Sequence, residues 1–414
     1  MAQIDYRYGR SGLCPSARPV PPAVELYRNE RLGIAGATCG EIARLTVSEL
    51  EAEFHPAEIS RSLRGFVSSL RTCVEQACLW GEVVFKPWFA GGTGVGVQCL
   101  IPDSYTLGRF ASDGTPAEAE FRSEARRGDR VYVRTERHVL ERGKCTVTNS
   151  VRVHELRTGR SYQGRLSDLP EWEGLSVKAV FENVSRPLFA VFSLPSGADG
   201  DGRGEAVFSR GIKLIRECEK QLDRLLWEYE GGELAIDASY DAFRTGRDGK
   251  PELPRGNERL WRTNMLDSCS SQSELLKIFA PQLRDGSYLR GLNRLLMHYE
   301  DAVGLSRGTF SDPLAEPRTA AEVLSTERRT FSLVADVRRA LIFALGDLCE
   351  ALNDLCRVYR LGMRCTLTVK SGDGVIEAGD GKTETYSGCA DDGGGPPEIA
   401  LGCITRSGSG DGRL

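Results

Sequence analysis

The stretch FSRGIKLIRECEKQLDRLLWEYEGG, residues 208–232, decides how this chain is organised. Its apolar residues recur about every 3.5 positions, which predicts a long amphipathic helix, and Gly231 and Gly232 form a helix stop. A second helix with the same kind of apolar face is expected over residues 288–303. The apolar seam of the first helix consists of Ile212, Ile215, Leu222, Leu225 and Tyr229.

The segment between these helices, residues 233–283, has the pattern of a small α/β insert. It holds two short strand-like runs, ELAID and LLKIFA, on either side of a turn-rich middle, GRDGKPELPRG. The order helix, insert, helix predicts two helices that run side by side, with the insert at their far end.

The first long helix also carries a stripe of basic residues. They recur at spacings of three and four, which places them on one face, opposite much of the apolar seam. Two interpretations stay open: a solvated face that pairs with Glu217 and Glu219, or a surface that meets DNA phosphates. The stripe consists of Lys213, Arg216, Lys220 and Arg224.

The region before these helices is predicted to hold two helices and then a β-rich segment. Residues 41–54 and 59–74 place apolar side chains at helical spacing. From residue 80 to about residue 192 the period changes to two, which predicts strands over GEVVFKPWF, VQCLIPDSY, RVYVRTERHVL and KCTVTNSVRVHEL. Glycines at 91, 92, 94 and 96 predict a hairpin turn and not a phosphate loop, because no helix and no GKS or GKT follows them.

The longest helix is predicted to reach about Tyr359, with a regular apolar stripe in its second half. The stripe fails over STERRT, residues 325–330, which predicts a kink or a looped-out segment that presents Glu327, Arg328 and Arg329. From residue 371 onward glycine is frequent and no period survives. A disordered tail is therefore expected.

Composition excludes several classes of function. The 414 residues carry a net charge of −4, which argues against a protein whose whole surface grips nucleic acid, so any DNA contact must be local. Thirteen cysteines without CxxC spacing predict free thiols in a reducing compartment. No apolar run has the length of a membrane span, and the first residues lack the pattern of a secretory signal. The chain is therefore expected in the cytoplasm that made it, without membrane contact.

No constellation of residues points to catalysis. The histidines, His55, His138, His154 and His298, lie in different segments, without a second His or Cys at ligand spacing. The sequence shows no Walker loop and no nucleophile next to a base. We expect no catalytic residue, no metal and no cofactor. A nucleic-acid enzyme is an alternative that would need one of these motifs.

One segment resembles a known family. GLSRGTFSDPLAEPRTAAEVLSTERRTF, residues 304–331, is similar to the GLS-GT and TATEV-S signature of portal proteins of long-tailed bacteriophages and their prophages. Further likeness lies in WGEVVFKPW, in the triplet Glu136, Arg137, His138, in RPLFAVFSLP and in LLWEYEGGELAID. These stretches follow the family's order over about residues 40–360. The chain departs from the family at GDGRGEAVF, where the family has a Ser-Pro-rich start of the long helix, and in its tail.

The resemblance implies an α+β, portal-type fold with an α/β wing, a two-helix stem, a small α/β clip and a long kinked C-terminal helix. It divides the chain into an N-terminal arm (1–22), the wing (23–203), the first stem helix (204–231), the clip (232–283), the second stem helix (284–304), a loop and the long kinked helix (305–360), and a Gly-rich tail (361–414) in place of a crown.

The resemblance also implies a function and its partners. The expected function is a homo-oligomeric ring, such as a dodecamer, at the capsid portal vertex of the virion, assembled in the host cytoplasm. Double-stranded DNA would pass through it without sequence preference. The implied protein partners are the terminase large subunit, a head-completion adaptor and the major capsid or scaffold protein. Another phage head protein, for instance a minor capsid protein, is the alternative.

Overall fold

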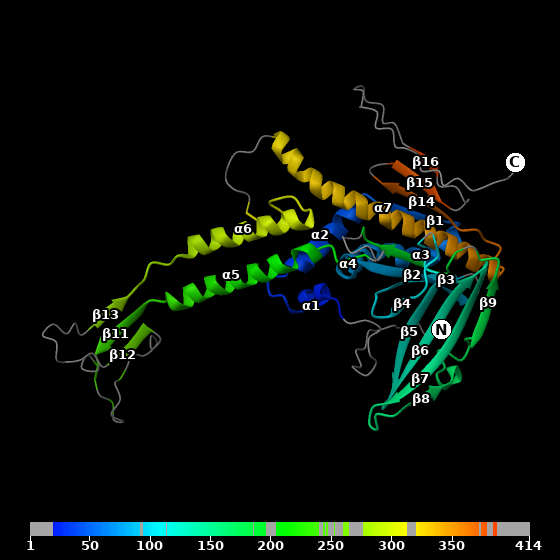
Figure 1. Cartoon of the computed structure of the whole chain (residues 1–414), viewed down its shortest axis with the longest axis horizontal. Helices are drawn as coiled ribbons and strands as arrows, with labels where there is room; N and C mark the ends of the chain where they lie inside the picture. Colours follow the sequence, from blue (N-terminus) through cyan, green and yellow to red (C-terminus); the bar gives the residue numbers. More distant parts are fainter. Residues whose placement is uncertain are drawn as a thin grey trace.

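The fold is given by a computed structural model of the whole chain, which mixes helices and sheets and confirms the α+β class. Figure 1 shows a body of helices and sheets from which two helices, α5 (Ile212–Gly231) and α6 (Asp285–Val303), project side by side. The structure describes residues 20–91, 94–112, 114–184, 186–195, 204–239, 243–244, 246, 252, 260–264, 276–312, 320–371, 374–378 and 384–386.

The body contains five further helices among its described residues and most of the strands. The helices are α1 (Pro22–Asn29), α2 (Ile34–Ser48), α3 (Ala57–Ser68), α4 (Leu70–Trp80) and α7 (Ala320–Val358), with the 3-10 turns η1 (Leu166–Asp168) and η2 (Ser209–Gly211). The strands are β1 (Glu51–His55), β2 (Glu82–Gly91), β3 (Gly94–Leu100), β4 (Tyr105–Leu107), β5 (Glu118–Arg127), β6 (Arg130–Glu141), β7 (Lys144–Glu155), β8 (Ser161–Gly164), β9 (Lys178–Glu182), β10 (Ala190–Ser193), β14 (Thr366–Ser371), β15 (Gly374–Ala378) and β16 (Glu384–Tyr386).

The main core lies between α7 and the N-terminal helices. α7 packs against α2, against strands β2 and β10, and against β14. Because its second half keeps one apolar stripe, a single helix can cover all of these elements. Fully buried members of this core include Ile42, Val74, Phe192, Leu341 and Leu345.

Three of the predicted strands of the β-rich segment are confirmed, as β2, β6 and β7. The run VQCLIPDSY, predicted as one strand, is wrong over residues 101–104, which form a turn between β3 and β4. Strands β4 to β9 form a six-stranded sheet in which β4 to β8 follow one another in order, with the β6–β7 hairpin at the centre, and β9 pairs with β7. The predicted glycine hairpin is also confirmed, since β2 and β3 are antiparallel and Gly91 pairs with Gly94. At Gly81, φ is +86° and an added Cβ would lie 2.1 Å from the carbonyl oxygen of Gly204, so only glycine fits this crossing of two chain segments.

The helix predicted over residues 41–54 is wrong in its second half. α2 ends at Ser48, and residues 51–55 form strand β1. This strand pairs antiparallel with β14, and Phe54 lies opposite Leu367, with both side chains buried. Helical spacing of Leu50 and Phe54 could not reveal a strand partner more than 300 residues away.

The disorder expected for the tail is wrong for three stretches of the chain. β14, β15 and β16 continue the sheet that begins with β1, in the order β1-β14-β15-β16. Backbone hydrogen bonds to β1 supply order that local glycine content cannot reveal. Residues 387–414 of the predicted tail and residues 1–19 of the predicted arm lie outside the described residues.

The two projecting helices are predicted correctly, and we call the pair α5 and α6 the stem. Gln221 on α5 donates to the backbone oxygen of Tyr288 on α6 at 3.1 Å. At the body end, Gly211 lies under the ring of Tyr299, where an added Cβ would be 2.4 Å from Cε2. Glycine at this position therefore lets α5 and α6 approach closely.

The far end of the stem carries the insert predicted from the sequence. Its described strands are β11 (Ala235–Ser239), β12 (Trp261–Asn264) and β13 (Leu276–Phe279), in the order β12-β11-β13. β11 is parallel to β12 and antiparallel to β13. The two strand-like runs recognised in the sequence correspond to β11 and β13, whereas β12 was not predicted.

Candidate functional site

The basic stripe lies on the outer side of the stem. The buried residues of α5 include Ile215, Cys218 and Leu225, whereas the four basic side chains are exposed. The arrangement follows from the sequence because residues three and four apart share one face of a helix. The four exposed side chains are those of Lys213, Arg216, Lys220 and Arg224.

Local contacts of the stripe show the pairing with Glu217, whereas the interpretation as a surface for DNA phosphates stays a prediction. Lys220 Nζ lies 2.7 Å from Glu217, and Arg224 donates to Gln221 at 3.2 Å. The pair with Lys220 lowers the pKa of Glu217. Glu219, the other expected partner, accepts the backbone N–H of Arg31 in the body at 2.7 Å. Exposed pairs of this kind are weak and screened by salt, and the Lys220 side chain remains exposed beside Glu217.

The far end of α5 exposes apolar side chains on more than one side. Trp227 is 66 % exposed, and Leu226 and Tyr229 are also exposed. Positions 226, 227 and 229 point in different directions from the axis of α5, so the single neighbouring helix α6 cannot cover all three side chains. Nearby, the Glu228 carboxylate holds Arg284 at the start of α6, with Nη2 at 2.8 Å, which locks the two helices together below the insert.

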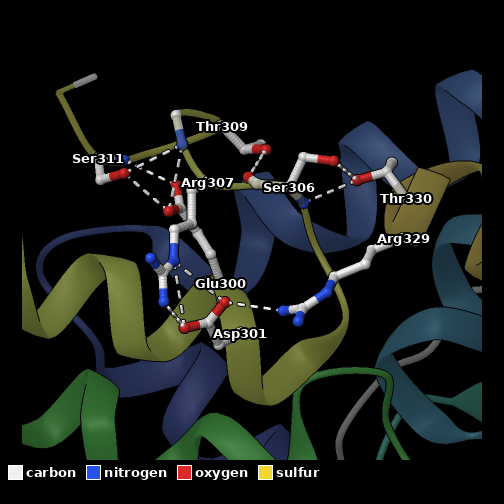
Figure 2. Close-up of polar contacts among 9 residues, drawn as sticks. Glu300, Asp301, Ser306, Arg307, Thr309, Ser311, Arg329 and Thr330 are labelled. Carbon is white, nitrogen blue, oxygen red and sulfur yellow. Dashed lines mark hydrogen bonds and ion pairs between the residues drawn. The ribbon is translucent and has the colours of Figure 1, made fainter. Parts of the chain in front are cut away.

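The loop after α6 is folded around a buried carboxylate, that of Glu300 (Figure 2). Glu300 Oε1 accepts the backbone N–H of Phe310 at 2.6 Å and that of Ser311 at 2.8 Å. Its Oε2 accepts the hydroxyl of Ser311 at 2.7 Å and the N–H of Gly308 at 3.3 Å. A carboxylate with several charge-assisted hydrogen bonds is a strong anchor, so Glu300 fixes the part of the GLSRGTFS segment that follows α6.

Next to it, Asp301 joins this loop to α7 (Figure 2). Arg307 binds both carboxylate oxygens of Asp301, with Nη2 at 2.6 Å, and Arg329 Nη1 lies 2.9 Å from Oδ1. The hydrogen bond from Arg307 lowers the pKa of Asp301, and Arg329 adds to this. Ser306 N donates to the Thr330 hydroxyl at 2.8 Å. We call residues Glu300, Asp301, Ser306, Arg307, Ser311, Arg329 and Thr330 the stem junction.

The looped-out segment predicted over residues 325–330 is wrong. These residues belong to α7, which is helical without interruption from Ala320 to Val358, and Figure 1 draws it as one continuous ribbon. At Arg329 and Thr330 the apolar stripe fails because these side chains make polar contacts in the stem junction. Arg328 is exposed, and the side chain of Glu327 lies outside the described residues.

Sequence reasoning missed Glu300 and Asp301 altogether. Carboxylates near the end of an amphipathic helix usually face solvent, and nothing local distinguishes these two. The usable signal was the run of small and polar residues after Gly304, which needs an acceptor for its backbone N–H groups once it folds back on α6.

A second polar cluster lies buried between β2 and β6 in the body. The Glu136 carboxylate accepts from Lys86 at 2.7 Å, from Arg134 at 3.1 Å and from His138 Nε2 at 2.7 Å. Burial acts to raise the pKa of Glu136, but Lys86, His138 and Arg134 together hold it well below the usual range. The alternation of β6 places Arg137, the middle residue of the triplet, on the other face, where it pairs with Glu118. The cluster fastens two sheets together.

The described residues offer no group of three His, Cys, Asp or Glu side chains placed to hold a metal ion. None of the described helices is both long enough and apolar enough to cross a membrane. No protein-family model and no curated protein matches this chain.

Proposed function

We propose that the chain is the portal protein of a tailed bacteriophage or prophage, a ring-forming subunit that lets DNA through the head vertex and catalyses no reaction itself. The observation that carries this proposal is the stem: two helices that leave the body side by side and hold a small sheet at their far end (Figure 1). The resemblance of residues 304–331 to the portal signature supports the same function.

The stem supports assembly into a ring because a pair of helices cannot bury all of its own apolar surface. Trp227, Leu226 and Tyr229 are exposed around the end of α5. A helix that is apolar on several sides is normally covered on each of them. In a closed ring with one repeated interface, the stem of the next subunit supplies this cover.

The basic stripe supports a channel for DNA. Repeated around a rotation axis, the exposed Lys213, Arg216, Lys220 and Arg224 become rings of positive charge. Such rings attract phosphates whatever the base sequence, and the attraction weakens as salt rises. A net charge of −4 on the whole chain fits a protein that is basic only where DNA passes.

The remaining parts have roles in this proposal. Residues 232–283 form the clip, which meets the terminase large subunit during packaging and a head-completion adaptor afterwards. Residues 23–203 form the wing, which faces the major capsid or scaffold protein. The ring belongs to the portal vertex of the virion and assembles in the host cytoplasm.

Light scattering on the purified chain tests the proposed interface. Trp227→Gln is expected to shift the population from rings toward monomers, because it removes the most exposed aromatic residue of the stem. Tyr162→Gln on β8 is the matched control, since Tyr162 is also exposed but lies on the sheet of the body. If both variants and the chain without substitutions show the same oligomer populations, the exposed end of the stem is not part of the ring interface.

DNA binding by the assembled rings tests the proposed channel. Changing Lys213, Arg216, Lys220 and Arg224 to Gln is expected to lower affinity for duplex DNA and to flatten its dependence on salt. The control changes four exposed arginines on the body, Arg127, Arg130, Arg157 and Arg160, to Gln. A control variant that loses as much affinity as the stem variant contradicts a channel lined by α5.

A further inference from the structure

Two cysteine thiols far from the stem lie in direct contact. Cys349 is on α7, and Cys365 is the residue before β14. Their Sγ atoms are 3.5 Å apart, and both residues are fully buried. A disulfide bond needs the sulfurs at about 2.05 Å, so each has to move by less than about 1 Å.

A side chain one turn further along α7 fixes the position of Cys365. Asn353 Oδ1 accepts the backbone N–H of Cys365 at 2.6 Å, and Asn353 Nδ2 donates to its carbonyl oxygen at 3.0 Å. The Cys349 thiol also lies 3.5 Å from this carbonyl oxygen. The contact between the two sulfurs is therefore held by a pair of backbone hydrogen bonds and does not depend on thiol packing alone.

We propose that Cys349 and Cys365 are an oxidative modification site that closes into a disulfide when the chain meets a low-molecular-weight disulfide such as glutathione disulfide. One cysteine thiolate attacks the glutathione disulfide, forms a mixed disulfide and releases one glutathione thiolate. The second cysteine thiolate then attacks the protein sulfur of that mixed disulfide and releases the second glutathione. Two thiols of the protein are oxidised and one small disulfide is reduced to two thiols.

The local fold permits this reaction but makes it slow. The contact with Cys349, together with burial, raises the pKa of the Cys365 thiol, so little thiolate is present in the closed state. Residues 359–364, which connect α7 to Cys365, are at least partly exposed, and displacing them opens the site without unfolding the core. The product ties α7 covalently to the sheet that contains β1 and β14.

Neighbouring thiols provide internal comparisons. Cys356 lies two turns after Cys349 on α7 and is buried. Cys73 and Cys99 contact each other between α4 and β3, and this contact raises the pKa of Cys99 and lowers that of Cys73. If buried cysteines oxidised without regard to the local geometry, Cys356 would appear among the products, whereas Cys73 and Cys99 are a second contacting pair whose oxidation can be compared with that of Cys349 and Cys365.

Peptide mapping of the folded full-length chain tests the proposal. After incubation with glutathione disulfide, free thiols are alkylated and the chain is digested with trypsin. Cleavage after Arg339, Arg357, Arg364 and Lys370 yields peptides 340–357 and 365–370. The proposal predicts these two peptides linked, with fragment spectra that place the link at Cys349 and Cys365. Incubation in denaturant, which removes the geometry, should give mixed pairings.

Variants separate the two cysteines of peptide 340–357. Cys356→Ser should keep the cross-link, and Cys349→Ala should lose it. In the chain without substitutions, reduction of the oxidised form should lower its melting midpoint. A link that persists in Cys349→Ala, or that disappears in Cys356→Ser, assigns the bond to Cys356 and overturns the proposal. So does full oxidation of Cys73 and Cys99 while Cys349 and Cys365 stay reduced.

Discussion

The carboxylate of Asp301 on α6 lies 2.9 Å from Arg329 on α7 and holds Arg307 of the intervening loop at the same time. One side chain thus connects the stem, the loop and the long helix. Since Arg329 already has a carboxylate partner, its charge is less available to DNA than that of the neighbouring Arg328, which is exposed. This difference separates two arginines that the sequence alone treats as equivalent.

We therefore predict that Arg328→Ala weakens binding of duplex DNA by assembled rings more than Arg329→Ala does. Both substitutions should leave the oligomeric state unchanged, because neither side chain belongs to the exposed apolar end of α5 that we propose as the interface. Titration at several salt concentrations measures the effect, and the loss of a phosphate contact should also reduce the salt dependence. Equal effects would show that Asp301 does not hold Arg329 when DNA is present, and no effect in either variant would place both arginines outside the channel.

Replacing the buried carboxylate of the stem junction should cost far more stability than replacing its neighbour. Glu300→Gln removes the charge and replaces one acceptor oxygen by an NH2 group, so the N–H groups that donate to that oxygen lose their acceptor, and we expect a loss of about 3 kcal/mol in the free energy of unfolding. Asp301→Asn removes only partly exposed ion pairs and should cost about 0.5 kcal/mol. Denaturant unfolding of the two variants measures the difference. Similar losses would mean that the loop is not anchored on Glu300.

Acid should destabilise the body through the buried cluster at Glu136. Burial lowers the pKa of His138 below 6.5, so as the pH falls the unfolded chain takes up this proton before the folded chain does. The pKa of Glu136 is depressed well below 4.5, so below that pH only the unfolded chain takes up its proton. In both cases the unfolded state binds more protons, and stability falls as pH falls.

His138 and Glu136 lower the stability in different pH ranges, so their two contributions can be measured separately. The loss from His138 begins below about pH 6.5 and that from Glu136 below about pH 4.5. The free energy of unfolding measured from pH 7.5 to pH 3.5 should therefore decline in two stages. His138→Gln should shrink the first stage. Glu136→Gln should shrink the second stage without abolishing it, because other carboxyl groups with a lowered pKa, such as that of Asp301, lose stability in the same range. A single unchanged curve in both variants would exclude the cluster as the cause.

Two glycines of the stem provide a matched test of its packing. Gly211→Ala places a methyl group 2.4 Å from the Tyr299 ring, and we expect a loss of about 1–3 kcal/mol. Gly231→Ala meets no atom within 4 Å and should be neutral or stabilise the helix by up to about 1 kcal/mol. Thermal unfolding of both variants measures the difference in their stability. A neutral Gly211→Ala would contradict the close approach of α5 and α6 at the body.

Local periodicity was enough to predict the elements whose faces are set by their own sequence. The seam of α5 and the alternation of β6 and β7 each repeat over ten or more residues, so one face of each is marked as buried. The exposed position of Lys213, Arg216, Lys220 and Arg224 followed from the same spacing. These parts of the fold and of the candidate site needed no distant contact to be recognised.

The errors share a different physical cause. Strand β1 and strand β14 each become ordered by pairing with the other, and neither carries a decisive signal alone. The turn of α7 around Arg329 looked like a break because its polar side chains have partners, Asp301 and Ser306, that only the folded loop supplies. Glu300 was missed for the same reason. Long-range pairing and buried polar contacts depend on the tertiary structure, which local patterns do not contain.

Negative-stain electron microscopy of the purified chain at micromolar concentration tests the central claim most directly. If the chain is a portal subunit, the images should show closed rings with rotational symmetry and a central channel wide enough for duplex DNA. The variant with Gln at positions 213, 216, 220 and 224 should form the same rings. Such rings, together with a loss of DNA binding, would show that the basic stripe is needed for DNA binding and not for assembly. Compact monomers at every concentration, or open filaments without a closed ring, would show that the chain is not a ring-forming portal subunit.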